Sequence, residues 1–304
     1  MLEAIGNTPA VKLQRLPSEG SGAVFVKIEG MNPTGSYKDR VALAMVRGAA
    51  ADGRIDSSTR LLECTGGSTG TSLAFVCAAR RIPLTIISSD AYARSKLDSM
   101  EALGAELLVE PCIDGKVTPD LWPRMRERAA ALHSAGAHHW VDQFNNAHAP
   151  SGYTAMGLEL VEQIDAPIDA FCGCVGTAGM IVGVGQVVRS RHPEARVVAL
   201  EPDTSPVLSG GAPGAHGIDG TAAGFVPPLF DREVVTDVRA LSEAAAREMA
   251  RRLAREEGIF AGTSTGMNVL AALQLADELG PDSTVVTVAC DTGFKYLQED
   301  LFRL

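Results

Sequence analysis

Asn32-Pro33-Thr34-Gly35-Ser36-Tyr37-Lys38-Asp39-Arg40 leads directly into the apolar run Val41–Val46. A Pro/Gly turn followed by such a run predicts that a helix begins close to Lys38. The positive end of a helix macrodipole disfavours an ammonium group, so we expect the pKa of Lys38 to be lowered and its amine to be more nucleophilic. Such a lysine is suited to Schiff-base chemistry. The alternative is an ordinary solvated lysine in a first helical turn.

The rest of the chain alternates short apolar runs with helical stretches. The runs expected to form strands are 23–29, 61–64, 84–87, 106–109, 168–172, 196–200 and 284–288. The expected helices are 71–80, 93–103, 119–132, a stretch ending at 189, 242–257 and 264–279, with a short strand between the last two. Repeated strand–helix–strand units predict parallel sheets, and ligands bind such sheets at the loops after the strands.

Length and composition suit an α/β protein of two domains or of one large domain. The 304 residues exceed the size of a typical single domain, and a hydrophobic content of 46% can supply the cores. The polar stretch Gln143–Pro150 is interpreted as a passage between domains. The segment Asp203–Asp231 has no regular pattern and is expected to be irregular.

Charge and cysteine usage exclude several classes of function. The net charge is −10 and the basic residues are scattered, which argues against a nucleic-acid or anionic-membrane partner. The chain has no basic-then-apolar leader and no apolar run of about 18 residues, so a cytoplasmic location is predicted. The six cysteines form no C-x-x-C pair, so no metal site is predicted and Cys172 and Cys174 are expected to be small buried residues of a strand.

The loop Gly173–Gly179 lies between an expected strand and an expected helix. Its glycines, Thr177 and the helix start can provide backbone N–H groups and a hydroxyl for a phosphate group. It follows neither the P-loop nor the dinucleotide-binding order of residues. The alternative is a tight turn selected for close packing.

A second loop, Thr65–Gly70, also joins a strand to a helix and suits an anion such as a substrate carboxylate. Residues 66–70 and 262–266 both fit G-x-S-x-G, the nucleophile elbow of serine hydrolases. The hydrolase order requires a histidine after the nucleophile, but the last histidine, His216, precedes Ser264. Histidines do follow Ser68, but none of them stands in a distinctive sequence context. The hydrolase interpretation is therefore set aside.

Asp291-Thr292-Gly293 follows the last apolar run and is expected to present a hydroxyl at the carboxyl edge of a sheet. A helix N-cap is the alternative role for the same residues, and both roles can coexist.

Together these motifs resemble the fold-type II pyridoxal-phosphate enzymes. Within them, the chain most resembles the cysteine synthase and cystathionine β-synthase family, and in particular its O-acetylserine sulfhydrylases. The similarity runs from Ile5–Pro9 to Lys295–Leu297 with the motifs in the expected order. It implies a tryptophan synthase β-like α/β fold of two domains, each a mostly parallel twisted sheet flanked by helices. It also implies a homodimer. The expected smaller domain comprises residues 1–12 and 35–145, and the larger comprises 13–34 and 146–304.

The resemblance assigns a role to each motif. Lys38 is the expected catalytic residue, which forms the internal aldimine with pyridoxal 5′-phosphate and then moves the α-proton. The expected cofactor-binding residues are Lys38, Ser68, Gly176, Thr177, Ala178, Gly179, Met180 and Thr292. The expected ligands of the substrate α-carboxylate are Thr65, Gly66, Gly67, Thr69 and Gln143. The Thr292 hydroxyl would meet the pyridine nitrogen and leave it unprotonated, which favours loss of a β leaving group over transamination.

The implied reaction is β-replacement on a serine-derived amino acid. O-acetylserine or O-phosphoserine would react with sulfide through an α-aminoacrylate to give cysteine. The same framework serves β-elimination of the cysteine desulfhydrase or serine/threonine dehydratase type, or a specialised β-replacement with another nucleophile. A cofactor-holding protein without activity is a further alternative, against which the retained Lys38 argues.

Two loops depart from the family pattern. The family commonly has Thr-Ser-Gly-Asn-Thr-Gly in the anion loop, where this chain has Gly66 for the serine and Ser68 for the asparagine. The phosphate loop usually ends in threonine, whereas this chain has Ala178 and Met180 in that loop. We therefore expect a shorter hydroxyl near the cofactor's 3′-oxygen and one phosphate hydrogen bond that is missing or comes from elsewhere.

Overall fold

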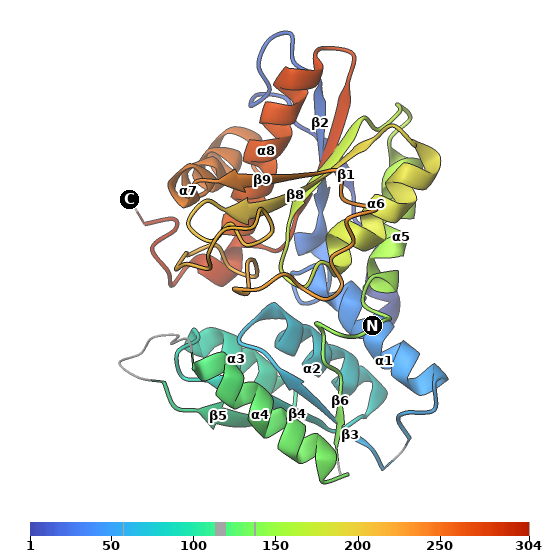
Figure 1. Cartoon of the computed structure of the whole chain (residues 1–304), viewed down its shortest axis with the longest axis vertical. Coiled ribbons are helices and arrows are strands. Elements are labelled where there is room, and N and C mark those ends of the chain that lie inside the picture. The colour runs from blue at the N-terminus through green and yellow to red at the C-terminus, as the bar shows by residue number, and fades with distance from the viewer. Residues whose placement is uncertain (57, 113–119, 137, 304) are drawn as a thin grey trace. The chain divides into compact units, whose positions relative to one another are not determined.

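The computed structural model describes residues 1–56, 58–112, 120–136 and 138–303 (Figure 1). The chain folds as two compact units: Met1–Ile5 with Lys38–Ala149, and Gly6–Tyr37 with Pro150–Leu304. The predicted helix start at Pro119 lies outside the described residues. Within the described ranges, no helix combines the length and apolar character needed to cross a bilayer.

The smaller unit is built on a four-stranded parallel sheet with the order β5-β4-β3-β6. Its strands are β3 (Arg60–Cys64), β4 (Leu84–Ser89), β5 (Glu106–Glu110) and β6 (His138–Trp140). Its helices are α1 (Lys38–Ala51), α2 (Ser68–Arg80), α3 (Arg94–Ala102) and α4 (Leu121–Ser134), with a 3₁₀ turn at Leu2–Ala4. Buried side chains of α4 pack on apolar residues of β3 and β4 and close one face of the sheet.

The register of this sheet brings three loops to one edge. Cys64 of β3 pairs with Ile87 of β4, and Leu62 of β3 pairs with Trp140 of β6. Because all these strands are parallel, the chain leaves each of them at the same edge. The loops that begin at residues 65, 90 and 141 therefore lie along that edge.

The larger unit contains a six-stranded sheet with the order β1-β2-β10-β7-β8-β9. Its strands are β1 (Ala10–Lys12), β2 (Ala23–Ile28), β7 (Ala170–Cys174), β8 (Arg196–Pro202), β9 (Asp237–Leu241) and β10 (Thr284–Ala289). Its helices are α5 (Ser151–Gln163), α6 (Gly179–Arg191), α7 (Glu243–Arg252) and α8 (Thr263–Leu279). Shorter turns are the 3₁₀ turns Glu29–Met31 and Gly293–Tyr296 and the π-helical turn Leu253–Glu257 that continues α7.

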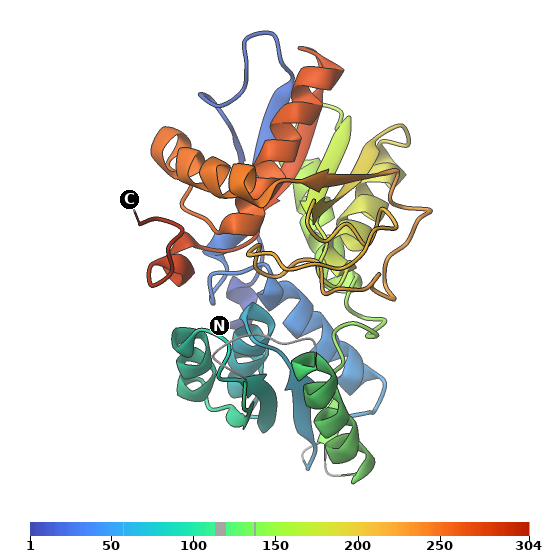
Figure 2. The ribbon, with the colours of Figure 1, turned by 60° about the vertical axis from the view of Figure 1, so that its left-hand side comes forward.

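Helices cover both faces of this sheet: α7 and α8 lie on one face, and α5 and α6 on the other (Figures 1 and 2). All strand pairs are parallel except β1 with β2. The strand residues Cys172 and Cys174 are buried in the core under α8, as the sequence predicted. The loops after β2, β7 and β10 leave from one edge, and each carries a predicted motif.

The two-domain α/β prediction is confirmed, with several elements added. The sequence did not predict β1, β6, β9 or α5. The expected short strand between α7 and α8 is wrong, because residues there form only a single bridge, Ala261 with Thr292. The sequence placed residues 1–12 in the smaller domain, whereas in the structure residues 6–12 lie in the larger unit, where Ala10–Lys12 pairs with β2. Residues 35–37 also belong to the larger unit, and residues 146–149 belong to the smaller one.

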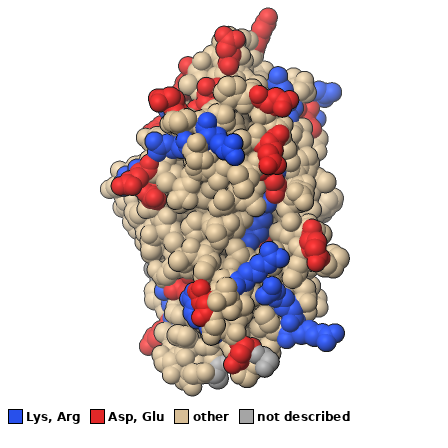
Figure 3. Space-filling view, turned by 90° about the vertical axis from the view of Figure 1, so that its right-hand side faces the viewer, with Lys and Arg blue, Asp and Glu red and all other residues tan. Residues whose placement is uncertain are grey.

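The surface carries both signs of charge. On the face drawn in Figure 3, acidic side chains are dispersed, whereas several Lys and Arg side chains lie close to one another.

Candidate functional site

Lys38 is the first residue of α1, as the sequence predicted. It is buried, with 8% of its surface exposed, and its neighbours Asp39 and Arg40 are also buried. An ordinary solvated lysine does not have this environment. The solvated surface alternative is therefore wrong, and the catalytic role of Lys38 stays a prediction.

The loop after β3 joins that strand to the start of α2. The backbone N–H of Thr65 donates to the carbonyl of Ile87 on β4 at 3.0 Å, which holds the loop to the sheet. The N–H of Gly67 donates to the Thr65 hydroxyl at 3.3 Å. The first N–H groups of a helix have no intrahelical partner, and no side-chain cap is found at the start of α2 in the described chain. These groups are suited to an anion.

Gln143 lies beside this loop, although 74 residues separate it from Thr69. The Thr69 hydroxyl donates to the Gln143 side-chain oxygen at 2.8 Å. The Gln143 side-chain amide donates to the carbonyl of Cys64 at 3.4 Å. The structure therefore brings together the sequence-predicted residues 65–69 and Gln143 on the smaller unit.

Glu63 holds the backbone of Gln143 by a hydrogen bond, and the sequence interpretation missed this residue. Its carboxyl group accepts the backbone N–H of Gln143 at 3.0 Å and the N–H of Cys64 at 2.7 Å. Burial and the nearby carboxylate of Asp142 raise the pKa of Glu63 from 4.5 to about 8, against these two hydrogen bonds. The sequence signal that could have identified Glu63 is that it is a single carboxylate inside the apolar run 61–64.

On the larger unit, a buried carboxylate holds the loop that leads to Lys38. Glu29 accepts the Thr8 hydroxyl at 2.6 Å and the Asn32 side-chain amide at 2.7 Å. The Asn32 side-chain oxygen accepts the N–H of Gly6 at 2.9 Å. These bonds explain why the Gly6–Thr8 turn and the Asn32 loop, far apart in the chain, both belong to this site.

The same loop is paired to the segment after β10. The N–H of Tyr37 donates to the carbonyl of Cys290 at 2.9 Å, and the N–H of Thr292 donates to the carbonyl of Gly35 at 2.9 Å. Gly35 has a φ of +73°, and a Cβ there would lie 2.6 Å from the Thr292 methyl group. This left-handed turn with no room for a side chain requires glycine. Backbone hydrogen bonds thus fix this loop as far as Tyr37, the residue directly before Lys38.

The Thr292 hydroxyl also caps the turn Gly293–Tyr296. It accepts the N–H of Phe294 at 3.4 Å. The N-cap role that the sequence allowed for Thr292 is confirmed. Its role toward a cofactor stays a prediction.

The Gly173–Gly179 loop ends β7 and begins α6. A Cβ on Gly176 would lie 2.3 Å from the carbonyl oxygen of Gly220, which belongs to a second loop. Only glycine therefore fits at position 176. The N–H of Ala222 donates to the carbonyl of Val175 at 2.9 Å and fixes the two loops together. Ala178 precedes α6 with a φ of +68°, a left-handed conformation that is unusual for alanine.

Met180 is buried in the first turn of α6 with its side chain against β7. A Cβ on Gly173 would lie 2.5 Å from the terminal methyl of Met180. The side chain therefore fills a space left by glycine in the strand. The loop's polar groups are its backbone N–H groups and the Thr177 hydroxyl.

The buried thiols of this unit are structural. The N–H of Cys174 donates to the side-chain oxygen of Asn268 at 2.8 Å, and burial raises the pKa of Cys172 to about 12. A thiol with so high a pKa is protonated and weakly nucleophilic. No cluster of three or more His, Cys, Asp or Glu that could hold a metal ion occurs among the residues that the structure describes.

The chain is similar to known proteins over nearly its whole length. A family model described as "Pyridoxal-phosphate dependent enzyme" matches residues 1–291. A cysteine synthase of Staphylococcus aureus is 38% identical over 305 residues, covering 99% of this chain and 96% of the relative.

Two solved structures have nearly the same fold. A cysteine synthase of Entamoeba histolytica has a TM-score of 0.93 and 30% identity, covering 100% of this chain and 90% of that chain. An O-ureido-L-serine synthase has a TM-score of 0.92 and 38% identity, covering 99% and 94%. With the family model and a relative that both span nearly the whole chain, this protein belongs to the family of pyridoxal-phosphate dependent enzymes.

Proposed function

We propose that this protein catalyses β-replacement on O-acetylserine or O-phosphoserine, with sulfide as the nucleophile and cysteine as the product. The observation that carries the proposal is Lys38, buried at the first residue of α1 and directly after a loop held by hydrogen bonds up to Tyr37. The similarity to cysteine synthases over 99% of the chain supports the choice of reaction.

The loop of the larger unit fits the phosphate of pyridoxal 5′-phosphate. Glycine at position 176 keeps the loop free of a side chain where the Gly220 carbonyl packs on it, and α6 begins without a side-chain cap in the described chain. Uncapped N–H groups at a helix start bind phosphate. The residues that would hold this group are Gly176, Thr177, Ala178, Gly179 and Met180, the last through its backbone.

Ser68 and Thr292 would contact the ring of the cofactor, Ser68 at the 3′-oxygen and Thr292 at the pyridine nitrogen. When bound, the cofactor supplies an electron sink that makes the Cα–H bond of the amino acid acidic. A neutral hydroxyl at the pyridine nitrogen moderates that sink.

The chain's own residues would orient the substrate and move its proton. The N–H groups and hydroxyls of residues 65–69, with Gln143, would bind the α-carboxylate. The Lys38 amine would take the proton from Cα, and the acetate or phosphate would leave Cβ with its bonding electrons. Sulfide would then form the new bond to Cβ, and Lys38 would return the proton to Cα.

Product analysis of the purified holoenzyme tests this proposal. With O-acetylserine and sulfide we expect stoichiometric cysteine, and a change in the cofactor's visible absorbance that reverses when sulfide is added. Lys38→Ala should abolish turnover while the protein still binds the cofactor through the phosphate loop. Normal turnover in that variant would overturn the assignment. Pyruvate and ammonia in place of cysteine would indicate β-elimination.

A second nucleophile is favoured by one comparison. The O-ureido-L-serine synthase is as similar in sequence to this chain as the cysteine synthase of Staphylococcus aureus is. Hydroxyurea is the nucleophile that would give O-ureido-L-serine by the same replacement at Cβ. Competition between hydroxyurea and sulfide for one O-acetylserine pool would rank the two.

We also propose that the protein is a homodimer, which the family resemblance supports, and that it is located in the cytoplasm. Sedimentation velocity of the holoenzyme at several concentrations tests the dimer, and cell fractionation tests the location. A monomer at all concentrations would contradict the first part.

A further inference from the structure

Tyr92 lies directly against the anion loop of the smaller unit. A Cβ on Gly66 would lie 2.4 Å from three atoms of the Tyr92 ring, Cδ1, Cε1 and Cζ. Real Cβ atoms do not approach a ring so closely, so any side chain at position 66 would have to displace the ring. The ring therefore occupies the space into which a side chain at position 66 would point.

The sheet topology explains this contact. Gly66 follows β3 and Tyr92 follows β4, and these neighbouring parallel strands end at the same edge. The N–H of Tyr92 donates to the carbonyl of Ser89 at 3.2 Å, and the N–H of Ala91 donates to the Ser89 hydroxyl at 3.2 Å. This turn fixes where the tyrosine leaves the strand.

Tyr92 also contacts the apolar core of the unit. Tyr92 is partly buried and packs against the cluster that joins β3, β4 and α4, which includes Cys64, Ile87 and Leu121. A rigid aromatic side chain between that core and the loop limits how far the loop can move toward the strand edge.

The neighbouring glycine behaves differently. A Cβ on Gly67 would meet no heavy atom within 4 Å among the described residues. The close approach is thus specific to Gly66, where the family pattern has a serine, and it comes from Tyr92.

We propose that Tyr92 is a positioning residue for the amino-acid substrate, which holds the carboxylate-binding loop in place by packing its ring on Gly66. This inference rests on the proposed function of that loop. The pair is matched: glycine at position 66 is required because tyrosine occupies position 92.

A double-mutant cycle tests the proposal on the holoenzyme. The variants are Gly66→Ser, Tyr92→Ala and the two combined, with Gly67→Ser and its combination with Tyr92→Ala as the matched control. The readouts are KM and kcat with O-acetylserine and sulfide, and the dissociation constant of L-alanine followed by the cofactor's absorbance. L-Alanine carries the carboxylate but has no leaving group at Cβ.

Gly66→Ser should raise KM for O-acetylserine and the L-alanine dissociation constant by about tenfold or more, with a smaller change in kcat. In the Tyr92→Ala background the same substitution should cost much less, because the space is open. The effect of Gly67→Ser should be the same in both backgrounds. Tyr92→Phe should retain more of the parent's L-alanine affinity than Tyr92→Ala does, since the packing comes from the ring.

Equal effects of Gly66→Ser with and without Tyr92 would overturn the proposal. So would a Tyr92→Ala enzyme whose KM and L-alanine affinity match those of the parent. If the parent itself binds cofactor and L-alanine but forms no cysteine, the proposed reaction fails while the loop proposal is still judged by L-alanine binding.

Discussion

The carboxyl group of Glu63 accepts the backbone N–H of Gln143 at 3.0 Å, inside the sheet edge that carries the anion loop. Glu63 is 2% exposed, and Gln143 in turn accepts the hydroxyl of Thr69 at 2.8 Å. A buried carboxyl thus connects the end of β3 to two residues that we propose bind the substrate carboxylate. Its ionisation affects the stability of the smaller unit.

The pKa of Glu63 is raised from 4.5 to about 8, chiefly by burial. Below pH 4.5 the group is protonated in both folded and unfolded chains and has no effect on the difference between them. Between pH 4.5 and about 8 the unfolded chain releases the proton more readily, so stability falls as pH rises, by up to about 1.4 kcal/mol per pH unit. Glu63→Gln should flatten this slope in denaturant titrations at pH 5, 6.5 and 8.

Glu106→Gln is the control for this experiment. Glu106 lies on β5 of the same sheet but is exposed, and it pairs with Arg60 at 3.0 Å. That variant should keep the parent's slope between pH 5 and 8. An unchanged slope in Glu63→Gln would mean that Glu63 ionises normally in the folded protein.

Much of the fold could be predicted because its strands are apolar and its helices follow glycine-rich loops. The start of α1 at Lys38 followed from a Pro/Gly turn before an apolar run, and the structure has it at that residue. By contrast, β6 is the three residues His138–Trp140, too short to give a pattern. The strand β9 contains Asp237 and Arg239, whose charges hide its role as an edge strand of the sheet.

The candidate site could be predicted loop by loop, but the contacts between its loops could not. Thr69 and Gln143 were assigned by resemblance, and their hydrogen bond depends on the pairing of β3 with β6. Nothing in the sequence indicates that Tyr92 packs on Gly66, because that contact depends on the register of β3 and β4. The sequence likewise does not indicate that the Met180 side chain packs against Gly173.

Ala178→Gly should stabilise the protein. Alanine at a φ of +68° carries a steric cost of about 1–2 kcal/mol, which the greater flexibility of an unfolded glycine offsets in part. We expect a net gain of about 0.5–1 kcal/mol in the free energy of unfolding. Ala178→Val should lose stability, since a β-branched residue is poorly tolerated at that φ. Equal unfolding midpoints for the alanine and glycine proteins would contradict this interpretation.

The Thr292 hydroxyl caps a turn, and we propose that it also contacts the cofactor, so substitutions of Thr292 should separate the two roles. Thr292→Ser keeps the hydroxyl that accepts the N–H of Phe294, and we expect it to retain the parent's cofactor spectrum. Thr292→Ala removes the cap, at a cost of about 1 kcal/mol, and should weaken cofactor retention moderately. Cofactor release during dialysis, followed by absorbance, measures the difference. Identical retention in both variants would place the pyridine nitrogen elsewhere.

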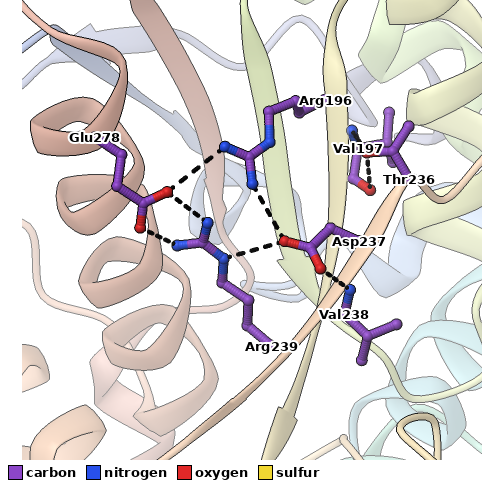
Figure 4. A network of polar contacts seen from close by, with 7 residues as sticks. All are labelled: Arg196, Val197, Thr236, Asp237, Val238, Arg239 and Glu278. Atoms are coloured by element: carbon purple, nitrogen blue, oxygen red, sulfur yellow. Dashed lines mark hydrogen bonds and ion pairs between the residues drawn. The ribbon is translucent and has the colours of Figure 1, made fainter.

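An ion-pair network joins β8, β9 and α8 at the end of the larger sheet (Figure 4). Arg239 donates two hydrogen bonds to Glu278, at 2.7 and 2.6 Å, and Arg196 lies 3.2 Å from Asp237 and 3.5 Å from Glu278. The hydrogen bonds from Arg239 lower the pKa of Glu278. The network should therefore stabilise the protein above the ordinary carboxyl range, and this contribution should be lost as pH falls through the lowered pKa.

Glu278→Gln should cost about 1 kcal/mol or less at pH 7, because the side chains are partly exposed, and the loss should shrink in 1 M salt. Urea titrations at two salt concentrations measure it. Glu194→Gln, at an exposed position, should show no comparable salt dependence. A loss that is unaffected by salt would mean that the packing of Glu278, and not its charge, is responsible.

Met180→Thr should trade stability for cofactor affinity. Removing the buried methionine side chain leaves a space against Gly173, with an expected loss of about 2 kcal/mol in the free energy of unfolding. The new hydroxyl at the start of α6 would add a donor for the phosphate, so pyridoxal 5′-phosphate should dissociate more slowly. Gly173→Ala crowds the methionine when introduced alone, but in the Met180→Thr protein its methyl group should refill the space and restore part of the stability. If Gly173→Ala has the same effect in both proteins, Met180 does not occupy the space beside the strand.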